Sequence, residues 1–176
     1  RDEQSLAIIA PGNLDDMVSL SRSYKSLKIP YIFDPGQSIP ALTTDNLLEM
    51  ITGSMLFISN DYELEMVLRS TGLSKDDLLD KTDAVITTLA ERGSIVRDKN
   101  GETSVRAVTP LKVSDPTGAG DSFRAGLIKG LVMGKTIREA ALMGAVCASF
   151  GVECQGTQCH WFSTEDFWTR HDGSLN

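Results

Sequence analysis

Short apolar runs alternate with amphipathic segments along the first half of the chain. Continuous apolar runs that stop at Pro, Gly, Asp or Asn are typical of buried strands, and they occupy residues 5–10, 29–33, 55–59 and 84–89. Helices are predicted where apolar residues recur between these runs, at residues 14–27, 44–51, 60–69 and 74–79. Thr44 or Asp45 is the expected N-cap of the second helix. The alternation predicts an α/β fold, with βαβ units on a mostly parallel sheet and helices on both faces.

The pattern changes in the second half of the chain. Residues 94–108 predict a hairpin that turns at Asn100-Gly101. Two helices rich in Ala, Leu and Gly are predicted at residues 119–133 and 137–150, and a last short helix at 164–170. The apolar stretch of residues 140–152 is interrupted by Gly and Ser, and it is shorter than the roughly 18 residues of a membrane span. We therefore expect no membrane partner.

Composition narrows the classes of partner further. The chain has 24 acidic and 17 basic residues among 176, which gives a formal net charge of −7. A negative surface disfavours nucleic acid and anionic membranes, but backbone N–H groups can still bind a small anion at one helix N-terminus. Three cysteines, at positions 147, 154 and 159, predict no disulfide framework. No signal peptide is visible, so a reduced, cytoplasmic protein is expected.

The most informative segment runs from Asp115 to Phe123, where a glycine-rich loop enters a predicted helix. Gly118 and Gly120 can present bare N–H groups to an anion at the helix N-terminus. Asp121 falls in the first helical turn, where a carboxylate can accept a proton from a hydroxyl during phosphoryl transfer. An ordinary capped helix, in which Asp121 only favours the helix dipole, fits the same spacing.

Resemblance to a known family decides between these alternatives. Residues 115–123 resemble the C-terminal signature of the ribokinase (PfkB) family of small-molecule kinases. Residues 60–63 (Asn-Asp-Tyr-Glu) resemble its Asn-x-x-Glu motif, and residues 87–93 resemble its Thr-Leu-Gly-x-x-Gly strand end, with Ala90 in place of a glycine. The bacterial adenosine kinases are the branch that five segments together resemble most, namely residues 33–37, 60–63, 115–118, 123–126 and 155–158.

The resemblance implies a ribokinase-like three-layer fold and transfer of the ATP γ-phosphate to the 5′-hydroxyl of adenosine. A sugar kinase and a non-catalytic nucleotide-binding module are the alternatives. Asp121 is then the expected general base. The expected anion hole consists of the N–H groups of Gly118, Ala119 and Gly120.

The resemblance also implies residues that hold cofactors. Mg²⁺, a hard cation that keeps its waters, is expected near Asn60 and Glu63, although Asn-x-x-Glu also fits a helix capping box. Asp115 and the Thr117 carbonyl resemble a monovalent-cation site, with K⁺ the expected ion. Near the phosphates and ribose of ATP, the resemblance implies Thr88, Ala90 and Gly93. Near the adenine it implies segment 146–157, with Gly156 and Thr157 close to the base.

Several other signals are set aside. Residues 130–136 imitate a phosphate-binding loop but have three residues between the glycines instead of four, so helix caps are the better explanation. Residues 12–16 are explained by a capped helix. Cys154, Cys159 and His160 are interpreted as a chance grouping, and Arg124 as a solvated surface residue.

Family members begin with a Gly-Gly motif and further strands that supply acceptor-binding residues and a lid. Nothing before Ser5 resembles them. We therefore expect residues 1–176 to be the C-terminal, nucleotide-binding and catalytic part of a single ribokinase-like domain, without its lid. A longer chain or a second chain, as in a homodimer, would supply the rest.

Overall fold

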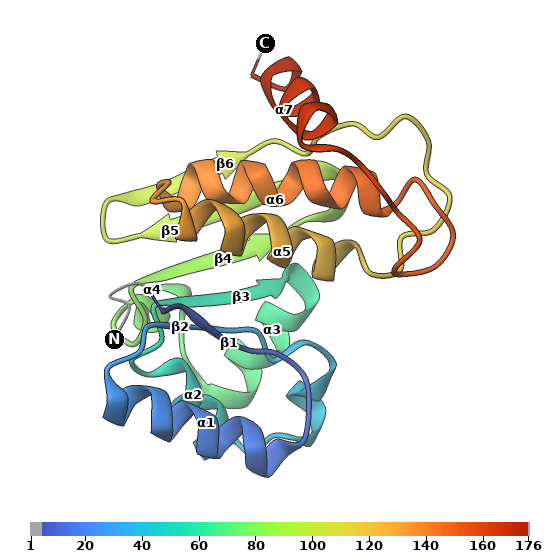
Figure 1. Cartoon of the computed structure of the whole chain (residues 1–176). Coiled ribbons are helices and arrows are strands. Elements are labelled where there is room, and N and C mark those ends of the chain that lie inside the picture. The colour runs from blue at the N-terminus through green and yellow to red at the C-terminus, as the bar shows by residue number, and fades with distance from the viewer. Residues whose placement is uncertain (1–4, 176) are drawn as a thin grey trace. The chain divides into compact units, whose positions relative to one another are not determined.

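The computed structural model describes residues 5–175, which form an α/β fold (Figure 1). The described residues divide into two compact units. The first consists of residues 5–89 and 95–103, and the second of residues 90–94 and 104–175. That residues 1–176 belong to a single domain stays a prediction.

A sheet forms the framework of the first unit. Its strands are hydrogen-bonded in sequence order, and they are β1 (Ala7–Ile9), β2 (Tyr31–Phe33), β3 (Leu56–Asn60), β4 (Ala84–Thr88), β5 (Ser94–Asp98) and β6 (Gly101–Val105). β1 to β4 pair in parallel, with Ile8 opposite Ile32 and Ile58 opposite Ile86. β2, β3 and β4 are buried along nearly their whole length, which explains their continuous apolar runs. The four predicted strands and the predicted hairpin are confirmed.

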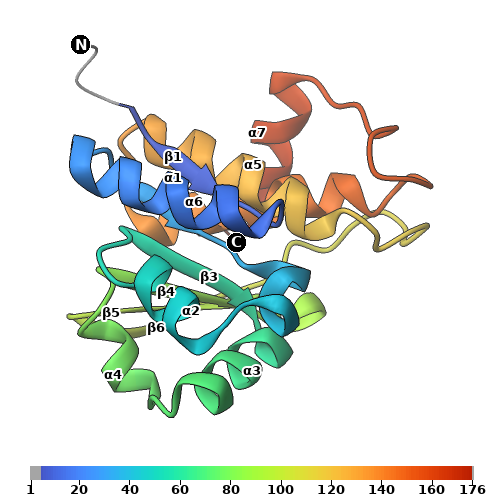
Figure 2. The same cartoon turned by 90° about the horizontal axis from the view of Figure 1, so that it is seen from below.

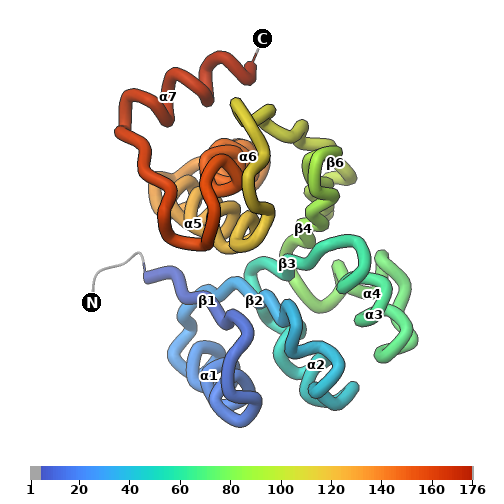
Figure 3. The backbone as a smooth tube through the Cα atoms, turned by 90° about the vertical axis from the view of Figure 1, so that its right-hand side faces the viewer, coloured from blue at the N-terminus to red at the C-terminus, as the bar shows by residue number. Residues whose placement is uncertain are grey.

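Helices of the first unit lie along one face of this sheet. They are α1 (Leu14–Leu27), α2 (Thr44–Ile51), α3 (Asp61–Thr71) and α4 (Lys75–Leu79), and a 3₁₀ helix, η1 (Gly36–Ala41), precedes α2. Figure 3 shows them on the same side of β1 to β4, and Figure 2 shows α1, α2 and α3 following one another across the strands. Right-handed crossovers between successive parallel strands require this placement. The apolar core includes Phe33, Leu47, Met50, Phe57 and Val67.

Side-chain caps determine where these helices begin. Asn13 caps α1, which confirms the explanation of residues 12–16 as a capped helix. The N-cap of α2 is Thr43, which has extended backbone angles and accepts a hydrogen bond from the N–H of Asn46 at 3.2 Å. The prediction of Thr44 or Asp45 was therefore wrong. The sequence offers neighbouring residues with equally good capping side chains, and only the backbone angles distinguish them.

The second unit is built on a helical hairpin. α5 (Ala119–Val132) and α6 (Ile137–Gly151) run antiparallel, side by side (Figure 1), and α7 (Thr164–Gly173) follows. A 3₁₀ turn, η2 (Ala90–Arg92), also belongs to this unit. Between α5 and α6, Gly134 has a φ of 76°, and Thr136 forms a capping box with Glu139. These contacts confirm that residues 130–136 are cap signals. No helix among residues 5–175 is both long enough and apolar enough to cross a membrane.

Candidate functional site

A left-handed turn at Gly118 opens α5. Gly118 is the N-cap residue, and its φ of 81° and ψ of 3° favour glycine. The N–H groups of Gly118 and Gly120 donate no hydrogen bond to any other described residue. The N–H of Ala119, in contrast, donates to the Pro116 carbonyl at 3.2 Å. Bare amides at the positive end of a helix dipole form a site for a small anion.

The hairpin brings the start of α5 to the end of α6. The two helices are antiparallel and similar in length, so these ends meet. Their close approach depends on small residues, because a Cβ at Gly144 would lie only 2.8 Å from the Phe123 carbonyl oxygen. Beyond α6, Thr157 reaches the Gly118 turn, since a Cβ at Gly118 would lie 3.2 Å from the Thr157 Cβ.

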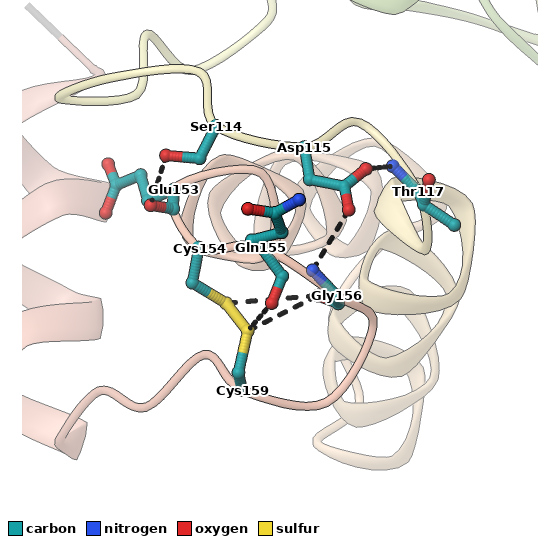
Figure 4. The surroundings of a disulfide bond; sticks show 8 residues. All are labelled: Ser114, Asp115, Thr117, Glu153, Cys154, Gln155, Gly156 and Cys159. Carbon is teal, nitrogen blue, oxygen red and sulfur yellow. Dashed lines mark hydrogen bonds between the residues drawn. A yellow bond between two sulfur atoms is a disulfide. The ribbon is translucent and has the colours of Figure 1, made fainter.

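Asp115 ties the Gly118 turn to the loop that follows α6 (Figure 4). Its Oδ1 accepts a hydrogen bond from the N–H of Thr117 at 2.9 Å, and its Oδ2 accepts one from the N–H of Gly156 at 3.0 Å. Hydrogen bonds from the side chain and backbone of Thr117, followed by that of Gly156, hold the pKa of Asp115 below its ordinary value of 3.8. Five predicted site residues, Asp115, Thr117, Gly118, Gly156 and Thr157, thus come together.

The segment that leads to this turn is anchored to the end of α6. The N–H of Asp115 donates to the Val152 carbonyl at 3.2 Å. Glu153 accepts a hydrogen bond from the N–H of Leu111 at 2.6 Å and forms an ion pair with Arg170 of α7 at 2.8 Å. The Arg170 and Glu153 side chains are only 15% and 16% exposed. Sequence reasoning missed this pair, because no local pattern links residues that lie on separate elements.

Asp121 stands in the first turn of α5, as predicted. Its side chain is 67% exposed, and its carboxylate forms an ion pair with Arg124, one turn further along. Arg124 is only 17% exposed, so the prediction of a solvated arginine was wrong. The reason is that Arg124 folds back onto the carboxylate. Asp121 is therefore accessible to a reactant while its charge is compensated.

Asn60 and Glu63 lie in the first unit, at the carboxyl end of β3. They form a capping box at the start of α3, because the N–H of Glu63 donates to Asn60 Oδ1 at 2.7 Å and the N–H of Asn60 donates to Glu63 Oε2 at 2.8 Å. The capping alternative is thereby confirmed, and it uses one carboxylate oxygen of Glu63. Thr88 is the register partner of Asn60 on β4, so these two predicted residues share one edge of the sheet.

Ala90 and Gly93 flank the η2 turn of the second unit. Ala90 has a φ of 52°, a left-handed conformation in which a glycine would be more stable. Gly93 has a φ of 88°, and a Cβ there would lie 2.6 Å from the backbone nitrogen of Ala107. Only Gly93 therefore requires glycine, because the chain's own backbone leaves no room for a Cβ there, whereas Ala90 adopts its left-handed conformation as an alanine.

Cys154 and Cys159 form a disulfide, with Cα atoms 6.2 Å apart, and Cys147 is free. The expectation that the three cysteines form no disulfide was wrong. The bond depends on the turn of residues 154–159, which the spacing of cysteines alone does not indicate. No group of three or more His, Cys, Asp or Glu residues that could hold a metal ion is found in the described part of the chain.

A cavity of about 750 Å³ lies within the second unit. Such a volume is in the range of small-molecule sites. Its lining includes Phe150 and Glu153, from the predicted adenine segment, together with Phe162 and Arg170. Phe150 stacks on Phe162 at 4.3 Å between ring centroids, and the Arg170 guanidinium lies 3.5 Å from the centre of the Phe150 ring. Gly156 and Thr157 do not line this cavity; they contact the Gly118 turn instead.

These features define an α/β protein with a glycine turn at a helix N-terminus and an exposed carboxylate in the first turn of that helix. Comparison with protein families gives the class a name. The model described as "pfkB family carbohydrate kinase" matches residues 7–162, and the chain belongs to that family.

Individual relatives agree with this assignment. The chain is 38% identical over 126 residues to a nucleoside kinase of Methanocaldococcus jannaschii, which covers 72% of this chain and 42% of the relative. A structure of Burkholderia thailandensis nucleoside kinase in complex with inosine superimposes with a TM-score of 0.95 at 30% identity, covering 99% of this chain and 58% of that one. A ribokinase of Thermotoga maritima shares the fold, with a TM-score of 0.80 at 20% identity over 97% of this chain and 57% of its own. The ribokinase-like fold is thus confirmed, and the chain spans about half the length of these relatives.

Proposed function

We propose that the chain carries the phosphoryl-transfer centre of an ATP-dependent kinase that phosphorylates a hydroxymethyl group. The observation that carries the proposal is the Gly118 turn, with bare amides at a helix N-terminus and the Asp121 carboxylate in the same helical turn. Phosphoryl transfer to an alcohol needs an anion site and a proton acceptor close together. Membership of the pfkB family supports the same chemistry.

Asp121 accepts the proton of the attacking hydroxyl in this mechanism. The N–H groups of Gly118 and Gly120 stabilise the negative charge that develops on the γ-phosphoryl oxygens. The N–H of Ala119 contributes less, because it already donates to Pro116. Arg124 forms an ion pair with the Asp121 carboxylate, which stays 67% exposed and can therefore receive the acceptor hydroxyl.

Two cations accompany the nucleotide in this proposal. Mg²⁺ neutralises phosphate charge when it is bound, and the residues that would hold its waters are Asn60 and Glu63. They fit a hard cation, because the capping box uses Glu63 Oε2 and leaves Oε1 as an oxygen donor. A K⁺ ion would take Asp115 and the Thr117 carbonyl, which supply oxygen ligands next to the anion-binding turn.

We infer that the acceptor is a nucleoside, with adenosine the first candidate. Two relatives named nucleoside kinase support this class, and the Burkholderia enzyme has also been determined in complex with ADP-inosine. For ATP, the cavity of the second unit is the proposed adenine site, because its volume suits a small molecule and its lining includes Phe150 and Glu153 of segment 146–157. A sugar kinase is the second candidate, favoured by the family description. A panel of adenosine, inosine, ribose and fructose separates the two classes. We also propose a cytoplasmic location, where ATP is supplied.

Asp121→Asn tests the proposed base. The substitution keeps the size and position of the side chain but removes the proton acceptor, so turnover should fall about 10²- to 10⁴-fold. Magnesium-ATP binding, measured by calorimetry, should stay within about threefold of wild type, since the bare amides remain.

Two outcomes would contradict the proposal in different ways. Near-normal turnover of Asp121→Asn would refute the assignment of the base. ATP binding by the wild-type protein without transfer to any acceptor in the panel would favour the third alternative, a non-catalytic nucleotide-binding module.

A further inference from the structure

A disulfide closes the loop that supports the Gly118 turn (Figure 4). Cys154 and Cys159 are separated by 5 positions, so the bond encloses a ring of six residues. Inside the ring, the N–H of Gly156 donates to Asp115, and Thr157 contacts the Gly118 turn. The crosslink therefore encloses Gly156 and Thr157, the two residues through which this loop contacts the Gly118 turn and its lead-in.

The ring has little else to order it. The segment between α6 and α7 contains no helix or strand, and Gln155, Thr157, Gln158 and Cys159 are exposed. Gly156 has a φ of 93°, and glycine loses more conformational freedom than any other residue when it is fixed. Without the crosslink, the entropy of this loop opposes the hydrogen bond from Gly156 to Asp115. With the crosslink in place, most of the conformational entropy of the loop is already lost before a ligand binds.

The two bonded cysteines differ in accessibility from the third. Cys159 is exposed and Cys154 is partly buried, so an external thiol can reach the sulfur of Cys159. Cys147 is free, and burial raises the pKa of its thiol to about 11. Cys147 is therefore protonated at neutral pH and does not compete in exchange. In reducing compartments, disulfides of this kind are usually transient and redox-sensing.

We propose that Cys154 and Cys159 form a redox-modification site that sets the affinity of the Gly118 turn for ATP. The proposal rests on the proposed function, because it names a regulation of the same site. A dithiol reductant supplies two electrons and two protons. Its thiolate attacks Cys159 Sγ and displaces Cys154 as a thiolate, which takes up a proton; its second thiol then resolves the mixed disulfide and releases Cys159. The protein gains two S–H bonds, and the reductant is oxidised to its own disulfide.

The direct test compares ATP binding by the oxidised and the reduced protein. The protein is equilibrated with glutathione disulfide or with dithiothreitol, and mass spectrometry verifies the difference of two hydrogen atoms. Magnesium-ATP affinity is then measured by calorimetry. Reduction should weaken binding by between about threefold and 40-fold, where the upper figure is the loop-closure entropy of a six-residue ring.

Variants assign the effect to the right cysteines. Cys159→Ser should bind ATP with the affinity of the reduced protein under both conditions, because it cannot form the bond. Cys147→Ser is the matched control and should keep the full redox dependence.

Hydrogen exchange separates failure of this proposal from failure of the proposed function. The amides of Gly156 and Thr157 should exchange more slowly in the oxidised protein, whether or not ATP binds. A protected loop in a protein that binds no ATP in either state would refute the proposed function and, with it, the regulatory role. The proposal is also overturned if the two states bind ATP within twofold of each other, or if glutathione disulfide forms no Cys154–Cys159 bond.

Discussion

A single methyl group added between α5 and α6 should disturb both stability and the Gly118 turn. Gly144 of α6 is buried against the first turn of α5. In Gly144→Ala, the new Cβ would lie 2.8 Å from the Phe123 carbonyl oxygen and 3.0 Å from Cδ2 of its ring. The first of these neighbours is backbone, so it cannot rotate away. Ordinary van der Waals contact begins at 3.4 Å, and the new Cβ would lie at 2.8 Å. The helices must therefore separate by the difference, about 0.6 Å.

The size of the effect follows from two opposing terms. Overpacking a buried site against backbone costs about 3 kcal/mol, at the upper end of the usual range. Alanine is a better helix former than glycine by about 1 kcal/mol, which leaves a net loss of about 2 kcal/mol. For a protein of this size, that loss lowers Tm by roughly 4–8 °C. Phe123 follows Asp121 by two residues, so ATP affinity should fall as well.

Thermal and urea unfolding of Gly144→Ala measure the loss. Gly173→Ala is the matched control for stability, because a Cβ at this helical position would meet nothing within 4 Å. It should be neutral or stabilising by up to about 1 kcal/mol. If Gly144→Ala were as stable as the control, the two helices would not depend on a glycine at this contact, and the packing argument would be refuted.

Two further predictions concern the groups that hold the turn in place. Arg170→Met leaves Glu153 buried without its cation and should destabilise the protein by about 3–5 kcal/mol in urea unfolding. Most of this loss should be recovered in the Arg170→Met, Glu153→Met double variant. Additive losses would contradict the pairing. The pKa of Asp115 is lowered in the folded protein, so its stabilising contribution is present above its ordinary pKa of 3.8 and is lost as pH falls through the lower, folded value. Acid unfolding should therefore depend less steeply on pH in Asp115→Asn than in wild type, and identical profiles would refute the linkage.

Much of the fold could be predicted because its signals are local. The bounds of α1 and α2 follow from helical spacing between turn residues, and the Asn60 capping box is written in four consecutive residues. The parallel sheet follows from the alternation of strands and helices. The start of α5 at the Gly118 turn is likewise visible in the sequence, because a glycine-rich loop precedes a helical pattern there, although that spacing alone also fits an ordinary capped helix.

The features that escaped prediction are side-chain contacts of the second unit that no sequence motif marks. The Cys154–Cys159 bond depends on how the loop after α6 turns, and the Glu153–Arg170 pair depends on how α7 packs. The burial of Arg124 depends on its neighbours in space, since its position on α5 alone gives a surface arginine. Of the three, the Glu153–Arg170 pair joins separate elements, whereas the disulfide and the Asp121–Arg124 pair are local contacts whose formation depends on side-chain conformation.

The proposed anion site lies between two carboxylates in a chain with a net charge of −7, so the contacts of these carboxylates matter for the proposal. Without partners, the carboxylates of Asp115 and Asp121 would repel a phosphate chain bound at the Gly118 turn. Asp115 instead accepts hydrogen bonds from Thr117 and Gly156, and Asp121 is paired with Arg124. Arg124 therefore compensates the charge of Asp121, whereas Asp115 stays ionised and its hydrogen bonds only reduce its repulsion of a phosphate bound at the bare amides. The net charge of the whole chain therefore matters less for phosphate binding than the groups that donate hydrogen bonds to these two carboxylates.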